Sequence, residues 1–204
     1  ASLLSLPTVD RERLLGGNWK IRPAAGMYFK RHWVEMIDAA PIDARYVRGW
    51  DLAATAAAEG TDPDWTCGTK VGKLPDGRFV IADHAFDRMG PNGVRKLIMS
   101  TATADSRDVT ISLPQDPGQA GKAQALEMVQ MLAGYPVKTA HVTGDKITRF
   151  SPFSAQAEAG NVLVVRGPWN DRLFTQLEAF GPDAVHDDDA DSTAQAFNEL
   201  TKPH

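Results

Sequence analysis

The sequence predicts an α/β domain with a mixed β-sheet. Three apolar and aromatic segments come first and have the pattern of strands, and a tight turn joins the last two, as in an antiparallel meander. Segments with helical and with strand periodicity then alternate, which is typical of strands added through helical crossovers. Helical patterns close the chain, so we expect a sheet flanked by helices.

The expected strands are short runs of apolar, β-branched and aromatic residues. Asp76-Gly77 is a strong hairpin sequence and lies between two of these runs. In chain order the expected strands cover residues 45–53, 65–74, 78–86, 108–113, 137–142 and 161–165.

The expected helices have apolar residues three and four positions apart, which places them on one face. In chain order they cover residues 93–104, 120–132, 152–159, 169–180 and 192–200. The residues expected to face the core are Val94, Leu97, Ile98 and Thr101 in the first helix and Ala125, Met128, Val129 and Leu132 in the second.

Residues 1–44 differ in character from the rest of the chain. A short helical pattern begins near Thr8, and an irregular stretch with glycines, prolines and several aromatic residues follows it. This aromatic content predicts an arm that packs on the body of the protein. We therefore expect an arm or linker over residues 1–44 and one domain over residues 45–204.

Composition excludes several classes of protein. With 43% hydrophobic and 24% charged residues among 204, the chain is neither disordered, nor collagen-like, nor a coiled coil. No apolar run approaches the length of about 18 residues that a membrane span needs. The net charge of −4 argues against purely electrostatic binding of nucleic acid, although metal ions could neutralise an acidic site.

Other motifs of known chemistry are missing from the sequence. Cys67 is the only cysteine, which excludes an intramolecular disulfide, predicts no cysteine-based zinc site and fits a reducing, cytoplasmic setting. No phosphate-binding loop and no nucleophile elbow is found. His32, His84 and His141 are isolated, and we interpret them as structural residues.

Two single aspartates stand at positions suited to chemistry. Asp51 interrupts an apolar strand, where a carboxylate is costly unless it is paired or binds a metal; a turn cap or a surface position is the alternative. Asp116 follows a predicted strand and precedes a helix, a usual place for active-site groups in α/β sheets. Its alternative role is that of a helix N-cap.

A cluster of acidic residues precedes the last predicted helix. Its members are Asp187, Asp188, Asp189 and Asp191. The helix dipole favours one or two carboxylates at such a position, but four repel one another, and a divalent cation would relieve the repulsion. A calcium-binding EF-hand is excluded, because the glycine and glutamate it requires are missing at their spacing.

Together the three acidic positions predict a two-metal centre for phosphodiester hydrolysis. Oxygen ligands select Mg²⁺ or Mn²⁺, and two such ions can activate water and stabilise a leaving oxygen. We expect Asp51 to be shared between the ions, Asp116 to complete one site and the cluster Asp187, Asp188 and Asp191 to complete the other. His186 could position water or could simply belong to the loop before the helix.

Three basic residues are candidates for contacts with DNA phosphates. They are Lys122, Lys146 and Arg149, and each could equally be an ordinary solvated charge.

These motifs, taken in order, resemble the C-terminal nuclease domain of phage large terminase subunits over about residues 45–200. The motifs are GWDLA, PQDPGQAGK, TGDKITRFSPFSAQAEAGNV and HDDDADS, and LLSLPTVDRERLLGGNW resembles the stretch that follows the ATPase domain in that family. The resemblance implies an RNase H-like fold, with three antiparallel strands first, then parallel additions, and helices on the sheet. It also implies a metal-dependent endonuclease that cuts concatemeric double-stranded viral DNA, with Asp51, Asp116 and Asp188 catalytic and Asp191 the next choice in the cluster.

The same resemblance implies partners that this sequence does not contain. In the family an ATPase motor lies N-terminal to the nuclease, and its motifs are missing here, so we expect this chain to cut DNA without translocating it. The small terminase subunit and the portal are the other expected partners, and the host-cell cytoplasm is the expected location. The remaining alternatives are another RNase H-like nuclease of the junction-resolvase type and a non-catalytic module whose acidic cluster contacts a basic partner.

Overall fold

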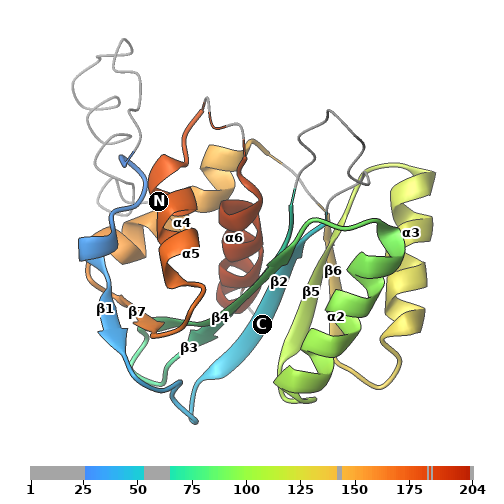
Figure 1. Cartoon of the computed structure of the whole chain (residues 1–204), viewed down its shortest axis with the longest axis horizontal. Helices are drawn as coiled ribbons and strands as arrows, with labels where there is room; N and C mark the ends of the chain where they lie inside the picture. The colour runs from blue at the N-terminus through green and yellow to red at the C-terminus, as the bar shows by residue number, and fades with distance from the viewer. Residues whose placement is uncertain (1–25, 53–64, 142–143, 183, 185, 203–204) are drawn as a thin grey trace.

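In the part of the chain that the computed structural model describes, seven strands form one sheet with helices on both faces (Figure 1). The structure describes residues 26–52, 65–141, 144–182, 184 and 186–202. The helical pattern expected near Thr8 therefore lies outside the described residues. Among the residues described, no helix is long and apolar enough to cross a membrane.

The sheet is mixed, as the sequence predicts. Its strands are β1 (Glu35–Ile37), β2 (Arg45–Asp51), β3 (Thr66–Lys73), β4 (Phe79–Asp87), β5 (Thr110–Gln115), β6 (Val137–His141) and β7 (Val162–Val165). They lie in the order β1-β7-β4-β3-β2-β5-β6. Strands β2, β3 and β4 form the expected antiparallel meander, and the other neighbours in the sheet pair in parallel.

The turn between β3 and β4 forms at the predicted position. Gly77 has a φ of +92°, a left-handed conformation that glycine adopts without strain. Its N–H donates to the carbonyl of Leu74 at 3.0 Å. The hairpin places the β3–β4 turn at the end of the sheet opposite to Asp51, because Asp51 pairs with Cys67 at the start of β3.

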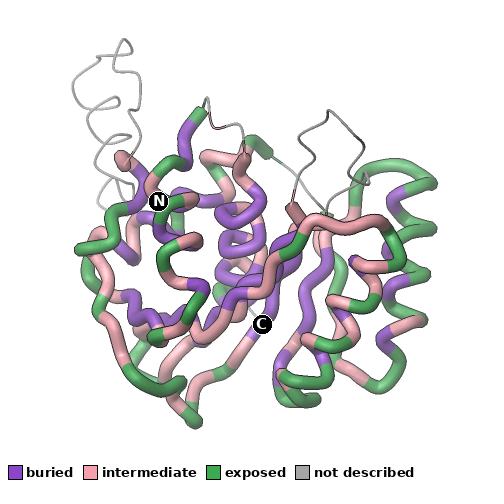
Figure 2. The backbone as a smooth tube through the Cα atoms, in the orientation of Figure 1, coloured by how far each residue is buried: buried purple, intermediate pink, exposed green. Residues whose placement is uncertain are grey.

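The helices cover both faces of the sheet (Figure 1). They are α2 (Pro91–Asp105), α3 (Gln119–Met131), α4 (Lys146–Glu158), α5 (Asn170–Ala179) and α6 (Asp188–Thr201), preceded by a 3-10 turn, η2 (Arg31–Trp33). Helices α4, α5 and α6 pack on one face over an aromatic core, and α2 and α3 pack on the other. Figure 2 shows α6 as a buried element along most of its length.

Helices α4 and α6 begin four or more residues earlier than predicted. Helix α4 begins at Lys146 and not near Pro152, because Asp145 caps it by accepting a hydrogen bond from the Thr148 N–H at 2.9 Å, and Pro152 lies inside the helix. Helix α6 begins at Asp188 and not at Ser192. The acidic cluster is therefore part of the first turn of α6.

The predicted inward faces of α2 and α3 are largely right. Ala125, Met128 and Leu132 are buried, but Val129 is 36% exposed, so its assignment to the core is wrong. Helix α3 packs on β5 at the side of the sheet, and that contact covers only a narrow face of the helix. In the first helix, the residues buried against the sheet are Val94, Ile98 and Ala102, while Leu97 and Thr101 are half-buried.

Part of the segment that the sequence sets apart as an arm belongs to the sheet and core. Strand β1 pairs in parallel with β7. Tyr28 and Phe29 are fully buried, and Tyr28 makes an edge contact with Phe180 at 5.8 Å between ring centroids. The sheet therefore begins before residue 45.

Candidate metal centre

The last residue of β2, Asp51, lies on the sheet face that α6 covers. Gly49, two residues earlier, faces the same helix, and a Cβ atom there would lie 2.3 Å from the Ala196 nitrogen and 2.5 Å from the Ser192 carbonyl oxygen. Only glycine permits so close an approach. As a result, α6 lies directly on β2, and its acidic first turn is brought to the end of that strand.

The carboxylates of Asp51 and the cluster influence one another strongly. Burial raises the pKa of Asp51 well above its ordinary value. The neighbouring carboxylates of Asp191, Asp188 and Asp187 raise this pKa further, while Arg149 lowers it. The structure therefore brings Asp51 together with the acidic cluster, as the sequence predicts, in an arrangement that disfavours full ionisation without a compensating cation.

Asp116 lies beside the same site, in the loop that follows β5. It is exposed, and it lines with Asp51 a pocket of about 120 Å³. Strands β2 and β5 are parallel neighbours, so their carboxyl ends meet at one edge of the sheet. The alternative role of helix N-cap is not observed, because Gly118 occupies the N-cap position of α3.

A second close approach of backbone and glycine fixes the position of Asp116. A Cβ atom on Gly121, in the first turn of α3, would lie 2.3 Å from the carbonyl oxygen of Asp116. The loop can fold back onto the helix only because this side chain is missing. Lys122, the next residue, is exposed in the same helical turn.

Two of the predicted DNA-binding residues lie in the first turn of α4 and contact the cluster. Lys146 Nζ lies 3.0 Å from Asp187 Oδ2, and an Arg149 Nη atom lies 2.7 Å from Asp191 Oδ2. Burial raises the pKa of Asp191, while the ion pair with Arg149 opposes that rise. These two cations neutralise part of the acidic charge but leave Asp51 without a direct salt bridge among the described residues.

One oxygen of the cluster is particularly suited to a metal ion. Asp191 Oδ1 is buried and accepts no hydrogen bond from any residue that the structure describes. A buried carboxylate oxygen without a donor is costly, and a cation would satisfy it. With Asp51 and Asp116, Asp191 provides a set of carboxylate oxygens, which fits Mg²⁺ or Mn²⁺. We call these carboxylates and the acidic turn of α6 the oxygen-only centre.

The fourth aspartate of the sequence cluster has a different environment. Asp189 is 1% exposed, and its Oδ1 lies 2.8 Å from His84 Nε2. Its Oδ2 accepts a hydrogen bond from Arg172 at 3.1 Å. Asp189 is thus held by β4 and α5, whereas its neighbours in α6 interact with Asp51. His84, which the sequence analysis describes as isolated, is buried and contacts both Asp189 and Thr69.

A second pocket at the site contains residues that the sequence analysis missed. Asp51 and Asp191 line it together with His141, Gln195 and Asn198. His141 is the last residue of β6 and pairs with Gln115, next to Asp116. Its place at the carboxyl end of a parallel strand is the signal that could have identified it. His186 is half-buried and directly precedes Asp187.

A mixed sheet with an antiparallel meander of β2, β3 and β4, helices on both faces, and carboxylates at the ends of β2 and β5, defines an RNase H-like domain. The sequence model of the terminase RNaseH-like domain matches residues 48–200. The chain therefore belongs to the family of terminase RNaseH-like domains.

Solved structures of terminase nucleases share this fold. The large terminase nuclease of thermophilic phage G20c has a TM-score of 0.58 at 15% identity, covering 82% of this chain and 95% of that one. The nuclease domain of Thermus phage P74-26 has a TM-score of 0.55 at 13% identity, with coverages of 82% and 92%. The human cytomegalovirus terminase nuclease domain, soaked with Mn, has a TM-score of 0.54 at 12% identity, with coverages of 89% and 91%.

The G20c nuclease has also been solved with bound magnesium, zinc and cobalt. Among curated proteins, no relative matches this chain.

Proposed function

We propose that this domain is a divalent-metal-dependent endonuclease that cleaves concatemeric double-stranded DNA during viral genome packaging. The observation that carries the proposal is the convergence of acidic residues from three separate elements, namely Asp51 at the end of β2, Asp116 after β5 and the first turn of α6. Membership of the terminase RNaseH-like family supports it.

In this proposal each carboxylate has a distinct task. Asp51, which contacts both pockets, is the shared ligand of two Mg²⁺ or Mn²⁺ ions. Asp116 completes one ion site, and Asp188 and Asp191, with Asp187 beside them, complete the other. When bound, such ions supply an activated water and stabilise the leaving 3′-oxygen of the phosphodiester.

The basic residues of the site hold the substrate. Lys146 and Arg149 lie at the cluster and, once cations neutralise the carboxylates, are free to contact DNA phosphates. Lys122 extends the same edge on α3. His186 is proposed to position water next to Asp187. In the complete packaging machine we propose an ATPase domain, the small terminase subunit and the portal as partners, in the cytoplasm of the host cell.

Plasmid cleavage in Mn²⁺ or Mg²⁺ tests the function. We expect wild-type protein to linearise and degrade supercoiled DNA, and Asp51→Asn and Asp116→Asn to lose nearly all activity, because asparagine keeps the shape but not the charge that holds the cation. Asp43→Asn is the matched control, since Asp43 is exposed just before the opposite end of β2. Equal trace cleavage by wild type and Asp51→Asn would show that the site is not a nuclease.

A further inference from the structure

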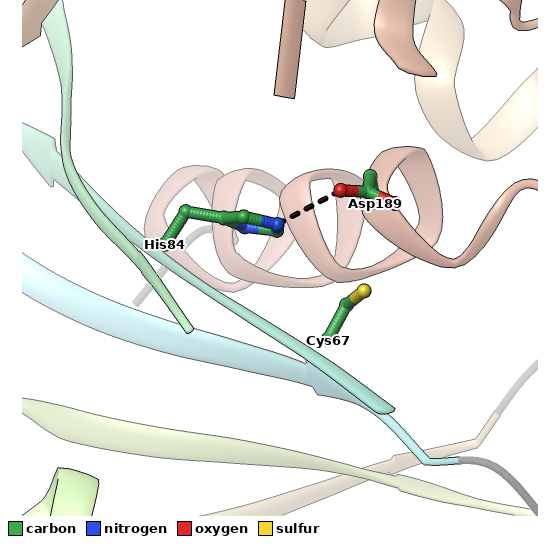
Figure 3. Close-up of side chains that lie close together, drawn as sticks. All are labelled: Cys67, His84 and Asp189. Atoms are coloured by element: carbon green, nitrogen blue, oxygen red, sulfur yellow. Dashed lines mark hydrogen bonds and ion pairs between the residues drawn. The ribbon is translucent and has the colours of Figure 1, made fainter. Parts of the chain in front are cut away.

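A second group of possible metal ligands lies beneath α6, apart from the oxygen-only centre. Cys67 of β3, His84 of β4 and Asp189 of α6 are buried, with exposed fractions of 0%, 4% and 1%. One ligand atom from each residue lies within 4.8 Å of the other two. We call these three residues the Cys-His-Asp cluster; Figure 3 shows them gathered between the strands and the helix.

The strand register explains why this cluster forms next to the acidic site. Cys67 pairs with Asp51 across β2 and β3, and Thr69 pairs with Gly49 on one side and with His84 on the other. Residues paired in this way point to the same face of a sheet. The close approach of α6 at Gly49 then places Asp189 over His84.

Hydrogen bonds already orient two of the three ligands. His84 Nδ1 lies 3.0 Å from the hydroxyl of Thr69, and Arg172 donates to Asp189 Oδ2 at 3.1 Å. The remaining ligand atoms, His84 Nε2 and Asp189 Oδ1, face each other at 2.8 Å. In metal sites, ligating histidines and carboxylates are held by such outer contacts through the atom that does not bind the ion.

We propose that the Cys-His-Asp cluster binds one zinc-like transition-metal ion through Cys67 Sγ, His84 Nε2 and Asp189 Oδ1. Nitrogen and sulfur ligands select zinc or cobalt over magnesium. On binding, the thiol releases its proton to solvent, and the imidazole proton moves from Nε2 to Nδ1, where the Thr69 oxygen accepts it. The site thus differs in metal class from the oxygen-only centre, and it departs from the sequence expectation that a single cysteine forms no cysteine-based zinc site.

The fit requires small movements. In a tetrahedral site with usual bond lengths, ligand atoms lie roughly 3.3–3.8 Å apart. The His84–Asp189 contact of 2.8 Å must therefore open by roughly 0.5 Å, and the widest separation, which is at most 4.8 Å, must shorten by roughly 1 Å. Because all three residues are buried, we expect the ion to enter during folding.

Cobalt absorption spectroscopy tests the proposal. The protein is refolded with Co²⁺, excess ion is removed, and the thiolate-to-cobalt charge-transfer band is recorded. Since Cys67 is the only cysteine, wild-type protein can show this band only through that residue. We expect one equivalent of cobalt with the band in wild type, and the same band in Asp51→Asn, whose oxygen-only centre is impaired. A folded wild-type protein without the band overturns the proposal.

Variants identify the other two ligands. We expect Cys67→Ser to lose the band, and His84→Asn and Asp189→Asn to lose or shift it, with folding checked by circular dichroism. An unchanged band in folded His84→Asn would overturn the assigned ligand set. Zinc content after refolding gives a second measurement, in which wild type should retain one equivalent more than Cys67→Ser. Neither readout depends on DNA cleavage, so the nuclease proposal can fail while this one stands.

Discussion

Arg149 and Asp191 join α4 to the acidic turn of α6 through a 2.7 Å ion pair, both side chains being largely buried. The same Asp191 presents its other oxygen, Oδ1, without a donor among the described residues. Arg149 thus neutralises Asp191 Oδ2, while Oδ1 can bind a cation. Arg149 and a metal ion therefore compete for the negative charge of the same carboxylate.

This competition predicts that Arg149→Gln strengthens metal binding. Removing a positive charge beside the site should tighten Mn²⁺ binding by up to about fivefold, because a partly screened charge pair contributes about 1 kcal/mol. Isothermal titration with Mn²⁺ measures the change, and DNA cleavage should fall because a phosphate contact is lost. Arg95→Gln is the control, since Arg95 forms an exposed pair with Glu127 in another part of the molecule. Weaker Mn²⁺ binding by Arg149→Gln would contradict this account.

The raised pKa of Asp51 predicts how stability varies with pH in the absence of metal. Its carboxyl has a higher pKa in the folded than in the unfolded protein, so the folded state binds more protons above pH 3.8. The free energy of unfolding should therefore fall as the pH rises from 3.8 towards the raised pKa. Chemical denaturation at a series of pH values should show this decline in metal-free wild-type protein. The decline should be smaller in Asp51→Asn, and it should also be smaller in wild-type protein with Mn²⁺ present. An identical pH dependence in wild type and Asp51→Asn would exclude Asp51 as its source.

Gly49→Ala is expected to damage the site through the backbone. The added methyl group would meet main-chain atoms of α6 that no side-chain rotation can move, so the helix must shift away from β2. We expect a loss of about 1–3 kcal/mol in the free energy of unfolding, as for other overpacked cores, together with loss of cleavage. Gly181→Ala is the matched control, because a Cβ there meets nothing within 4 Å. Denaturation curves that coincide for the two variants would refute the close approach.

Gly121→Ala is expected to displace Asp116 without unfolding the protein. Alanine inside a helix is usually favoured over glycine by up to about 1 kcal/mol, yet here it would meet the carbonyl oxygen of Asp116. We therefore expect a protein that remains folded, with a displaced Asp116 loop and cleavage reduced at least tenfold. Unfolding curves and plasmid cleavage measured on the same sample decide the matter, and wild-type activity in this variant would show that the loop does not need this contact.

Local sequence patterns were sufficient for much of this architecture. The positions of Asp51 at a strand end and Asp116 between strand and helix follow from apolar runs and turn residues that lie next to them in the chain. The start of α4 could not be predicted in the same way, because Pro152 resembles a helix start whereas the true cap is Asp145. Strand β1 is only three residues long and is stabilised by pairing with the distant β7.

The different roles of the aspartates in the acidic cluster depend on contacts with residues that are remote in sequence. Nothing near Asp189 distinguishes it from its neighbours; His84, 105 positions away, and Arg172 on α5 do so. The importance of Gly49 likewise depends on the path of α6. Such tertiary contacts are not encoded in any local periodicity, so the sequence located the cluster but not the role of each member.

The matched variants Asp189→Asn and Asp191→Asn test whether these two aspartates have different roles. Asp189 compensates the charge of Arg172 in the interior, where removing one member of a buried pair costs about 3 kcal/mol, so Asp189→Asn should lower the free energy of unfolding by that order. Asp191→Asn removes a carboxylate whose charged form is disfavoured by burial and by Asp187. We therefore expect little loss in the free energy of unfolding, but loss of Mn²⁺ affinity and of cleavage. Denaturation and Mn²⁺ titration of both variants provide the comparison. Because the two residues lie two positions apart in one helical turn, a reversed pattern would mean that α6 presents the opposite face to Asp51.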